Sequence, residues 1–135
     1  MIMTLFFCCS NLGQYDDTTP WDNSKRKMCS IVAIDALKFP KPDIQFKDEG
    51  MLRELKKAYV GYCPWLKTPA SGVATGNWGC GAFGGNKQLK ALLQLMVCCV
   101  TSRPLVYFTF GDDALQKDLL KLYLFLKEKE LTVGT

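Results

Sequence analysis

A glycine-rich segment between a short apolar run and a helical pattern constrains the fold of this chain most. Residues 73–85 have the sequence VATGNWGCGAFGG, in which the first three residues favour a short strand, and Asn86 follows as a helix N-cap. Apolar residues then recur at helical spacing: Leu89, Leu92, Leu93, Met96 and Val100. A strand, a glycine loop and a helix start in this order bring backbone N–H groups together where phosphate groups bind. The segment therefore predicts an α/β unit with an anion site in its loop.

Strand and helix patterns also alternate before this loop. The β-branched run at 30–37 predicts a buried strand, which Pro40 and Pro42 end. A helix is predicted from Asp48, as its N-cap, to a point near Pro64. We expect its inner face to carry Leu52, Leu55, Tyr59 and Tyr62, and its outer face Arg53, Glu54, Lys56 and Lys57.

The C-terminal part continues the same alternation. Residues 105–110 (LVYFTF) predict a strand bounded by Pro104 and Gly111. A helix begins at Asp112 or Asp113, and its apolar stripe is Leu115, Leu119, Leu122 and Leu126. The order strand, helix, strand, helix, strand, helix predicts an α/β layer with parallel pairing of some strands. A length of 135 residues with 48% apolar side chains fits one domain or a piece of one.

Composition excludes several classes of function. Histidine is absent, so the usual base for a Ser or Cys nucleophile and the commonest zinc ligand are both missing. Seven cysteines form an odd count without a C-x-x-C pair, which predicts reduced thiols, no disulfide framework and no metal site. A net charge of +4 without a block of like charges predicts no direct DNA binding. No apolar run is long enough to span a membrane.

The loop contains residue types that a simple chain reversal does not need. Asn77 places an amide beside the large aromatic Trp78, and Phe83 stands between glycines. Phe110 stands at the C-terminal end of its strand, the edge at which open α/β sheets bind ligands. The alternatives are a tight turn that binds nothing and, for Phe110, an ordinary core aromatic. Without histidine, Cys80 is interpreted as structural rather than nucleophilic.

Two local motifs allow other interpretations. Gly79, Gly81 and Gly84 satisfy the G-x-G-x-x-G spacing, and Asp112 follows the next strand, as in a nicotinamide-dependent oxidoreductase. The strand before that loop is less continuously apolar than such a fold requires. Acidic pairs, including Asp112 with Asp113, stand at helix starts or in polar loops, where capping and solvation explain them better than acid–base catalysis.

The string at 73–85 resembles the phosphate-binding loop of poly(ADP-ribose) glycohydrolases. The similarity continues through DTTP at 17–20, IVAIDAL at 31–37, LRELKKAY at 52–59, VYFTFGD at 106–112 and LTVG at 131–134. It therefore covers about 15–134, so we divide the chain into an unmatched segment, 1–14, and part of a glycohydrolase catalytic domain, 15–135. The resemblance implies a partial macrodomain-like mixed sheet flanked by helices.

The resemblance also implies a ligand and the residues that bind it. The ligand would be ADP-ribose or poly(ADP-ribose), carried by poly(ADP-ribosyl)ated proteins in the nucleus or the cytoplasm, with no cofactor. Contacts to the diphosphate and its adjacent ribose would come, largely through backbone N–H groups, from Asn77, Trp78, Gly79, Cys80, Gly81 and Ala82. Phe83 would orient the ribose, and Phe110 would pack on the adenine.

One part of the family pattern is missing from this sequence. The catalytic signature of the family, a run of glycines leading into Gln-Glu-Glu, lies upstream of the matched region and is not found here. Hydrolysis of a glycosidic bond needs such carboxylates, so no catalytic residue is assigned. We expect a fragment of the glycohydrolase that does not hydrolyse the polymer alone. The alternative is an inactive ADP-ribose-binding module or regulator.

Overall fold

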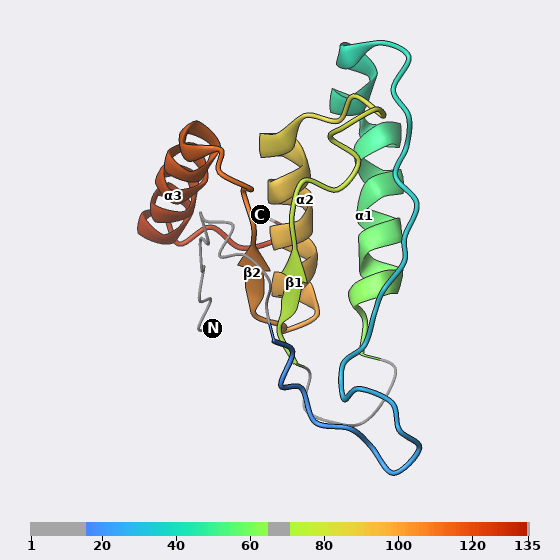
Figure 1. Cartoon of the computed structure of the whole chain (residues 1–135). Helices are drawn as coiled ribbons and strands as arrows, with labels where there is room; N and C mark the ends of the chain where they lie inside the picture. Colours follow the sequence, from blue (N-terminus) through green and yellow to red (C-terminus); the bar gives the residue numbers. More distant parts are fainter. Residues whose placement is uncertain (1–15, 65–70, 135) are drawn as a thin grey trace.

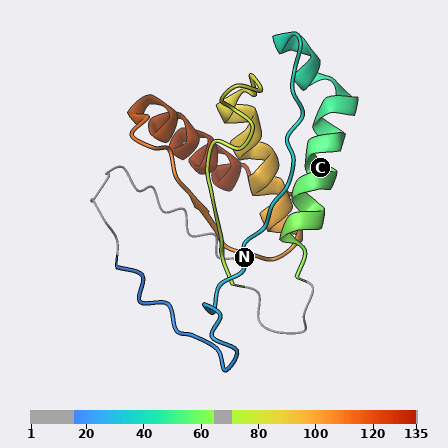
Figure 2. The ribbon, with the colours of Figure 1, turned by 45° about the vertical axis from the view of Figure 1, so that its right-hand side comes forward.

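The computed structural model describes residues 16–64 and 71–134, which form three α-helices packed side by side and a short sheet (Figure 1). The elements are η1 (Pro42–Phe46, a 3-10 helix), α1 (Asp48–Tyr62), β1 (Val73–Thr75), α2 (Lys87–Val100), β2 (Leu105–Tyr107) and α3 (Asp113–Glu128). α2 packs between α1 and α3, as both views show (Figures 1 and 2). Within the described ranges no helix is long and apolar enough to cross a membrane.

β1 and β2 form a parallel pair joined by α2. Val73 lies opposite Leu105, and Thr75 lies opposite Tyr107. Because parallel strands need a crossover connection, the helix that follows the glycine loop returns the chain to start β2 beside β1. The predicted α/β class is therefore confirmed, and the sheet of the described residues is this parallel pair.

Two apolar clusters hold the helices to the sheet. The larger one joins α1, α2 and both strands through Ala58, Tyr62, Val73, Leu95, Val97, Cys98 and Leu105. The smaller one fixes α3 to α2 and β2 through Ala91, Tyr107, Leu115 and Leu119. α2 contributes to both clusters, so the helix that follows the glycine loop is the most firmly packed element of the fold.

Several local predictions are confirmed. The strand at 73–75 and the helix after the loop are present, and the side chain of Asn86 caps that helix by accepting from the Leu89 N–H at 2.9 Å. Asp112 caps α3 in the same way, accepting from the Leu115 N–H at 3.0 Å. The strand predicted at 105–110 ends earlier, at Tyr107, because its partner β1 ends at Thr75, which lies opposite Tyr107. Phe110 has a left-handed φ of 56°, which no regular strand contains.

The strand predicted at 30–37 is not formed in the described structure. These residues are extended but have no sheet partner, and Ile31 is 93% exposed. Their backbone bonds instead to side chains: the Leu37 N–H donates to Glu54, and the Ile34 carbonyl accepts from the Trp78 indole. A β-branched run becomes a strand only where a neighbouring strand supplies a hydrogen-bond ladder, and the described part of the chain supplies none here.

The predicted faces of α1 are wrong only in part, because Tyr62 is buried and Leu55 packs against the larger core cluster, as predicted. Glu54, expected on the outer face, is only 1% exposed, whereas Leu52 and Tyr59, expected inside, are exposed. The inner stripe is Gly50, Glu54, Ala58 and Tyr62, spaced four residues apart. Burial of Glu54 is possible because the ammonium group of Lys90 on α2 contacts its carboxylate.

Candidate ligand-binding site

The glycine loop connects the C-terminal end of β1 to the first turn of α2. Phe110 follows β2 at the same edge of the sheet, so the two predicted parts of the site come from adjacent parallel strands. Gly79 and Gly84 have φ values of 73° and 72°, in the left-handed region that only glycine adopts at little cost. These two glycines therefore allow the backbone turns that connect the strand to the helix.

Backbone N–H groups of the loop remain available to a ligand. The loop closes on itself through Cys80 N–H to the Asn77 carbonyl at 3.0 Å and Gly85 N–H to the Gly79 carbonyl at 3.0 Å. Within the part of the chain that the structure describes, other N–H groups have no protein acceptor, namely those of Gly79, Gly81, Ala82 and Phe83. They adjoin the N-terminus of α2, whose unpaired N–H groups carry partial positive charge. An anion is the ligand that this arrangement favours.

The loop is open at Gly81. A Cβ atom built on Gly81 meets no other heavy atom within 4 Å, whereas one on Gly79 would lie 2.5 Å from the Ala36 Cβ. Gly79 is therefore required by the protein itself. The fold does not require glycine at position 81. The remaining reason for a glycine there is that a ligand can approach its backbone closely.

Two aromatic side chains are exposed at this edge. Phe83 is 42% exposed and Phe110 is 75% exposed. The Phe110 ring lies over Gly76, because a Cβ on Gly76 would come within 2.6 Å of the Phe110 Cε2 atom. Phe110 is thus not the core aromatic of the alternative reading, and its ring is available for stacking on a flat ligand group.

The side chains of Asn77 and Trp78 face the protein. The Asn77 Oδ1 atom accepts from the buried Tyr107 hydroxyl at 3.0 Å, and the Trp78 indole donates to the Ile34 carbonyl at 3.2 Å. Both side chains therefore fix the loop to its surroundings, which leaves the backbone of these residues as their main route to a ligand. Tyr107 was not among the predicted site residues, because its role depends on a contact between β2 and the loop.

Cys80 has the properties of a structural thiol. Burial raises its pKa to about 11, and the positive charge of Lys87 only partly opposes this shift. The thiol group lies 3.5 Å from the Trp78 carbonyl, to which it can donate. A thiol with so high a pKa is almost entirely protonated at neutral pH, which agrees with the interpretation that Cys80 is not a nucleophile.

A buried ion pair beneath the loop was missed by the sequence analysis. Lys90 and Glu54 are each 1% exposed and in contact, and the Lys90 ammonium lies 3.9 Å from the centroid of the Trp78 ring. The Glu54 Oε1 atom also accepts from the Leu37 N–H at 2.9 Å and from Arg53 at 2.6 Å. The pair thus connects α1, α2, the loop and the extended segment before η1. Helical spacing in the sequence could have predicted the burial of Lys90, because Lys90 shares a face of α2 with the buried residues Leu93, Gln94 and Val97.

Asp112 is occupied by other contacts. Its carboxylate caps α3 and pairs with Lys87 at 2.6 Å, and the hydrogen bond from Lys87 is the main reason that the pKa of Asp112 is lowered. A nicotinamide-dependent oxidoreductase needs an acidic side chain that is free to bind the ribose hydroxyls, so the contacts of Asp112 argue against this alternative. Among the described residues there is no cluster of three side chains able to hold a metal ion.

Comparison with known proteins identifies relatives of nearly the whole chain. Residues 6–117 match the family described as poly(ADP-ribose) glycohydrolase, macro domain fold. The chain is 33% identical to "Probable poly(ADP-ribose) glycohydrolase 2" of Arabidopsis thaliana, over 90% of this chain and 30% of that protein. It is 34% identical to poly(ADP-ribose) glycohydrolases 2 and 1 of Caenorhabditis elegans, over 84% of this chain and 24% and 15% of those proteins. The chain therefore spans less than a third of the length of these relatives.

Proposed function

Since this chain belongs to the poly(ADP-ribose) glycohydrolase family, we propose that its glycine loop binds the ADP-ribose unit of poly(ADP-ribose). The diphosphate would lie against the free N–H groups of Gly79, Gly81 and Ala82 at the N-terminus of α2. Phe83 would contact the ribose and Phe110 would stack on the adenine. The observation that carries this proposal is the set of unpaired N–H groups beside two exposed aromatic rings.

We propose that the chain contributes the ligand site of a glycosidase, and that the catalytic carboxylates come from the part of the family's domain that precedes the matched region. Cleavage of a ribose–ribose bond needs one carboxylic acid to protonate the leaving oxygen and a second carboxylate opposite it. Three acidic residues close to the loop in the described structure are already engaged. Glu54 pairs with Lys90, Asp112 with Lys87, and Asp35 with Lys57 and Arg53.

A second candidate is an ADP-ribose-binding module without hydrolytic activity. The engagement of these carboxylates favours it over hydrolysis by this chain alone. In both cases the biological ligand would be ADP-ribose on poly(ADP-ribosyl)ated proteins in the nucleus or cytoplasm. The two candidates differ in one measurement, the release of free ADP-ribose from the polymer with and without the preceding part of a relative's catalytic domain.

Calorimetric titration of the purified chain with ADP-ribose tests the binding site. Gly81→Val adds a side chain where the protein leaves open space, so it should block the diphosphate without disturbing the fold. Phe110→Ala should weaken binding about 5- to 150-fold, since stacking of one base contributes about 1–3 kcal/mol. Phe125→Ala, an exposed phenylalanine on α3, is the matched control and should bind as the unmodified chain does. Equal affinity of all three variants would refute the proposed site.

A further inference from the structure

A buried glutamine on α2 lies beneath the start of the glycine loop. Gln94 is 0% exposed, and its side-chain amide bonds to three other parts of the fold. The Oε1 atom accepts from the hydroxyls of Tyr62 and Thr75, each at 2.6 Å, and the Nε2 atom donates to the Gly76 carbonyl at 3.1 Å. Gln94 thus connects α2 to the end of α1, the end of β1 and the first residue of the loop. None of the proposed contacts to ADP-ribose involves its side chain.

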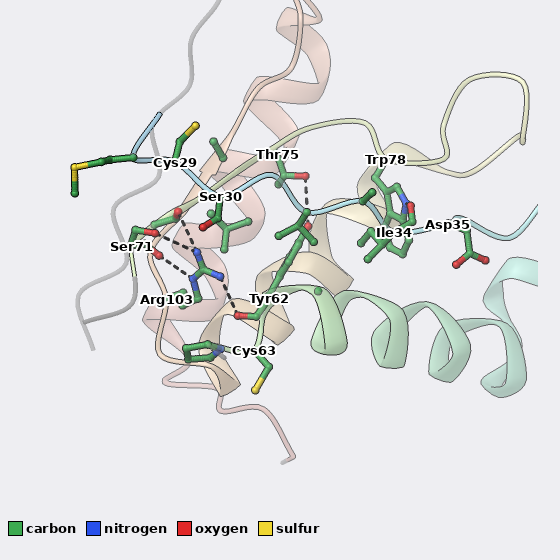
Figure 3. A pocket seen from close by; sticks show the side chains of 18 residues that line it. Cys29, Ser30, Ile34, Asp35, Tyr62, Cys63, Ser71, Thr75, Trp78 and Arg103 are labelled. Atoms are coloured by element: carbon green, nitrogen blue, oxygen red, sulfur yellow. Dashed lines mark hydrogen bonds between the residues drawn. The ribbon is translucent and has the colours of Figure 1, made fainter. Parts of the chain in front are cut away.

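The partners of the Gln94 amide fix its orientation. A carbonyl oxygen can only accept, so the group that faces Gly76 must be the NH2 group. Burial raises the pKa of the Tyr62 hydroxyl, so this hydroxyl stays protonated at neutral pH and donates to the oxygen end of the amide. Figure 3 shows Tyr62 and Thr75 directed toward one another, and their hydroxyl oxygens are 3.4 Å apart. The two hydroxyls therefore hold the amide in the orientation that donates to the loop.

The peptide group that Gln94 contacts would otherwise rotate easily. A Cβ atom on Gly76 would lie 2.6 Å from the Phe110 Cε2 atom and 2.9 Å from the Phe108 carbonyl oxygen, so the fold requires glycine there. Glycine permits rotation of the adjoining peptide group at low steric cost. The Gly76 carbonyl also accepts from the Trp78 N–H at 2.7 Å, but Trp78 belongs to the same loop. Among the described residues, Gln94 is therefore the contact that ties this peptide group to the rest of the fold.

Fixing the Gly76 carbonyl also fixes the N–H that follows it. The Gly76 C=O and the Asn77 N–H belong to one planar peptide group and point in opposite directions. Because the carbonyl is directed toward α2, the Asn77 N–H points away from that helix, and no backbone acceptor in the described structure bonds to it. The Tyr107 hydroxyl holds the Asn77 side chain separately. A rotated peptide group would present an oxygen in place of this N–H, and the partial negative charge of that oxygen would repel an anion.

We propose that Gln94 is a positioning residue of the ADP-ribose site, which turns the Asn77 N–H toward the diphosphate beside the other free N–H groups of the loop. It acts through the Gly76–Asn77 peptide group and does not touch the ligand. Its bond to Tyr62 makes the end of α1 part of the support of the site. The inference rests on the proposed function, because it assigns a role within the same site.

Two substitutions of Gln94 separate this role from packing. Gln94→Met fills a similar volume but neither donates nor accepts, so it should weaken ADP-ribose binding about tenfold or more at every pH, the factor expected for a hydrogen bond to a charged group. Gln94→Glu keeps an oxygen for Tyr62 and Thr75 but donates to the Gly76 carbonyl only when its carboxyl group is protonated. Its affinity should therefore rise about fivefold or more as the pH falls from about 8 to about 5.5, a range in which buried carboxyl groups titrate. Calorimetric titration of the unmodified chain should give a constant affinity over this range.

Nuclear magnetic resonance provides a readout of the loop without ligand. The carbonyl carbon resonance of Gly76 reports hydrogen bonding to that carbonyl, so it should shift in Gln94→Met. In Gln94→Glu it should titrate with pH at the midpoint of the affinity profile, which a purely structural role would not produce. Thr109→Val is the matched control, since Thr109 is 1% exposed and its hydroxyl has no hydrogen-bond partner within the described ranges. This variant should change neither the resonance nor the affinity.

The outcomes distinguish the role of Gln94 from the proposed function. Circular dichroism verifies the fold of each variant. Normal affinity of folded Gln94→Met, or an unshifted Gly76 resonance in it, would overturn the positioning role. If Gln94→Met does not fold, Gln94→Glu decides, and a Gly76 resonance that titrates while the affinity stays constant would overturn the role. Absence of ADP-ribose binding by the unmodified chain would refute the proposed function instead, and the Gly76 resonance would still decide whether Gln94 fixes the loop.

Discussion

Replacing Lys90 with methionine would leave the Glu54 carboxylate buried without its ammonium partner. Both side chains are 1% exposed, so water cannot substitute for the lost contact. Removal of one partner from a buried pair typically costs about 3–5 kcal/mol, which is a large fraction of the about 5–15 kcal/mol that stabilises a domain. We therefore expect Lys90→Met to lower the free energy of unfolding by about 3–5 kcal/mol.

A double variant separates the ion pair from the packing of its side chains. Adding Glu54→Gln to Lys90→Met removes the unpaired charge and keeps a side-chain oxygen for the Leu37 N–H. Buried ion pairs replaced by neutral groups of similar volume are often neutral in stability, so most of the loss should be recovered. Arg26→Met in the exposed Asp22 pair is the control and should change stability little.

Urea denaturation followed by circular dichroism at neutral pH measures these differences. The coupling energy is the loss in the double variant minus the sum of the losses in the single variants. We expect it to be negative by at least about 2 kcal/mol, since Lys90→Met leaves Glu54 with only the partly exposed Arg53 as a charged partner and Glu54→Gln leaves the buried Lys90 ammonium without a carboxylate. Losses that simply add would show that the two charges do not depend on each other, and would refute the argument that Lys90 makes burial of Glu54 possible.

The structure supports further predictions. Burial raises the pKa of Cys98 to about 12, above its value of about 9 in the unfolded chain, so the folded state retains a proton that the unfolded state loses. The contribution of Cys98 to the free energy of unfolding should be complete below pH 9 and decline as pH rises toward 12. Cys98→Ala should flatten this part of the curve of stability against pH. An unchanged curve would contradict the burial argument. Iodoacetamide labelling followed by mass spectrometry should modify the exposed Cys29 before Cys98, and the reverse order would exclude the described burial. Gly79→Ala should destabilise by more than about 1 kcal/mol, because of its left-handed φ and the contact with Ala36, while Gly81→Ala should be nearly neutral; similar thermal midpoints for the two would disprove the distinction.

The sequence alone determined the elements whose cause is local. The glycines that turn the chain after β1 and the caps Asn86 and Asp112 depend on residues within a few positions of each other. Their conformations follow from short-range sterics and from side-chain oxygens that satisfy nearby N–H groups. The glycine loop and the starts of α2 and α3 were therefore predicted from the chain order. Phe110 was predicted as the last residue of its strand, whereas β2 ends at Tyr107.

Only the tertiary structure decided which side chains are buried and which extended segment is a strand. Glu54 is inside because Lys90, on another helix, contacts it, and the run at 30–37 is not a strand because no described segment pairs with it. Phe110 is exposed because the strand ends before it. Burial of a charge and pairing of a strand both require a partner distant in sequence, and hydrophobic periodicity along the chain carries no information about that partner.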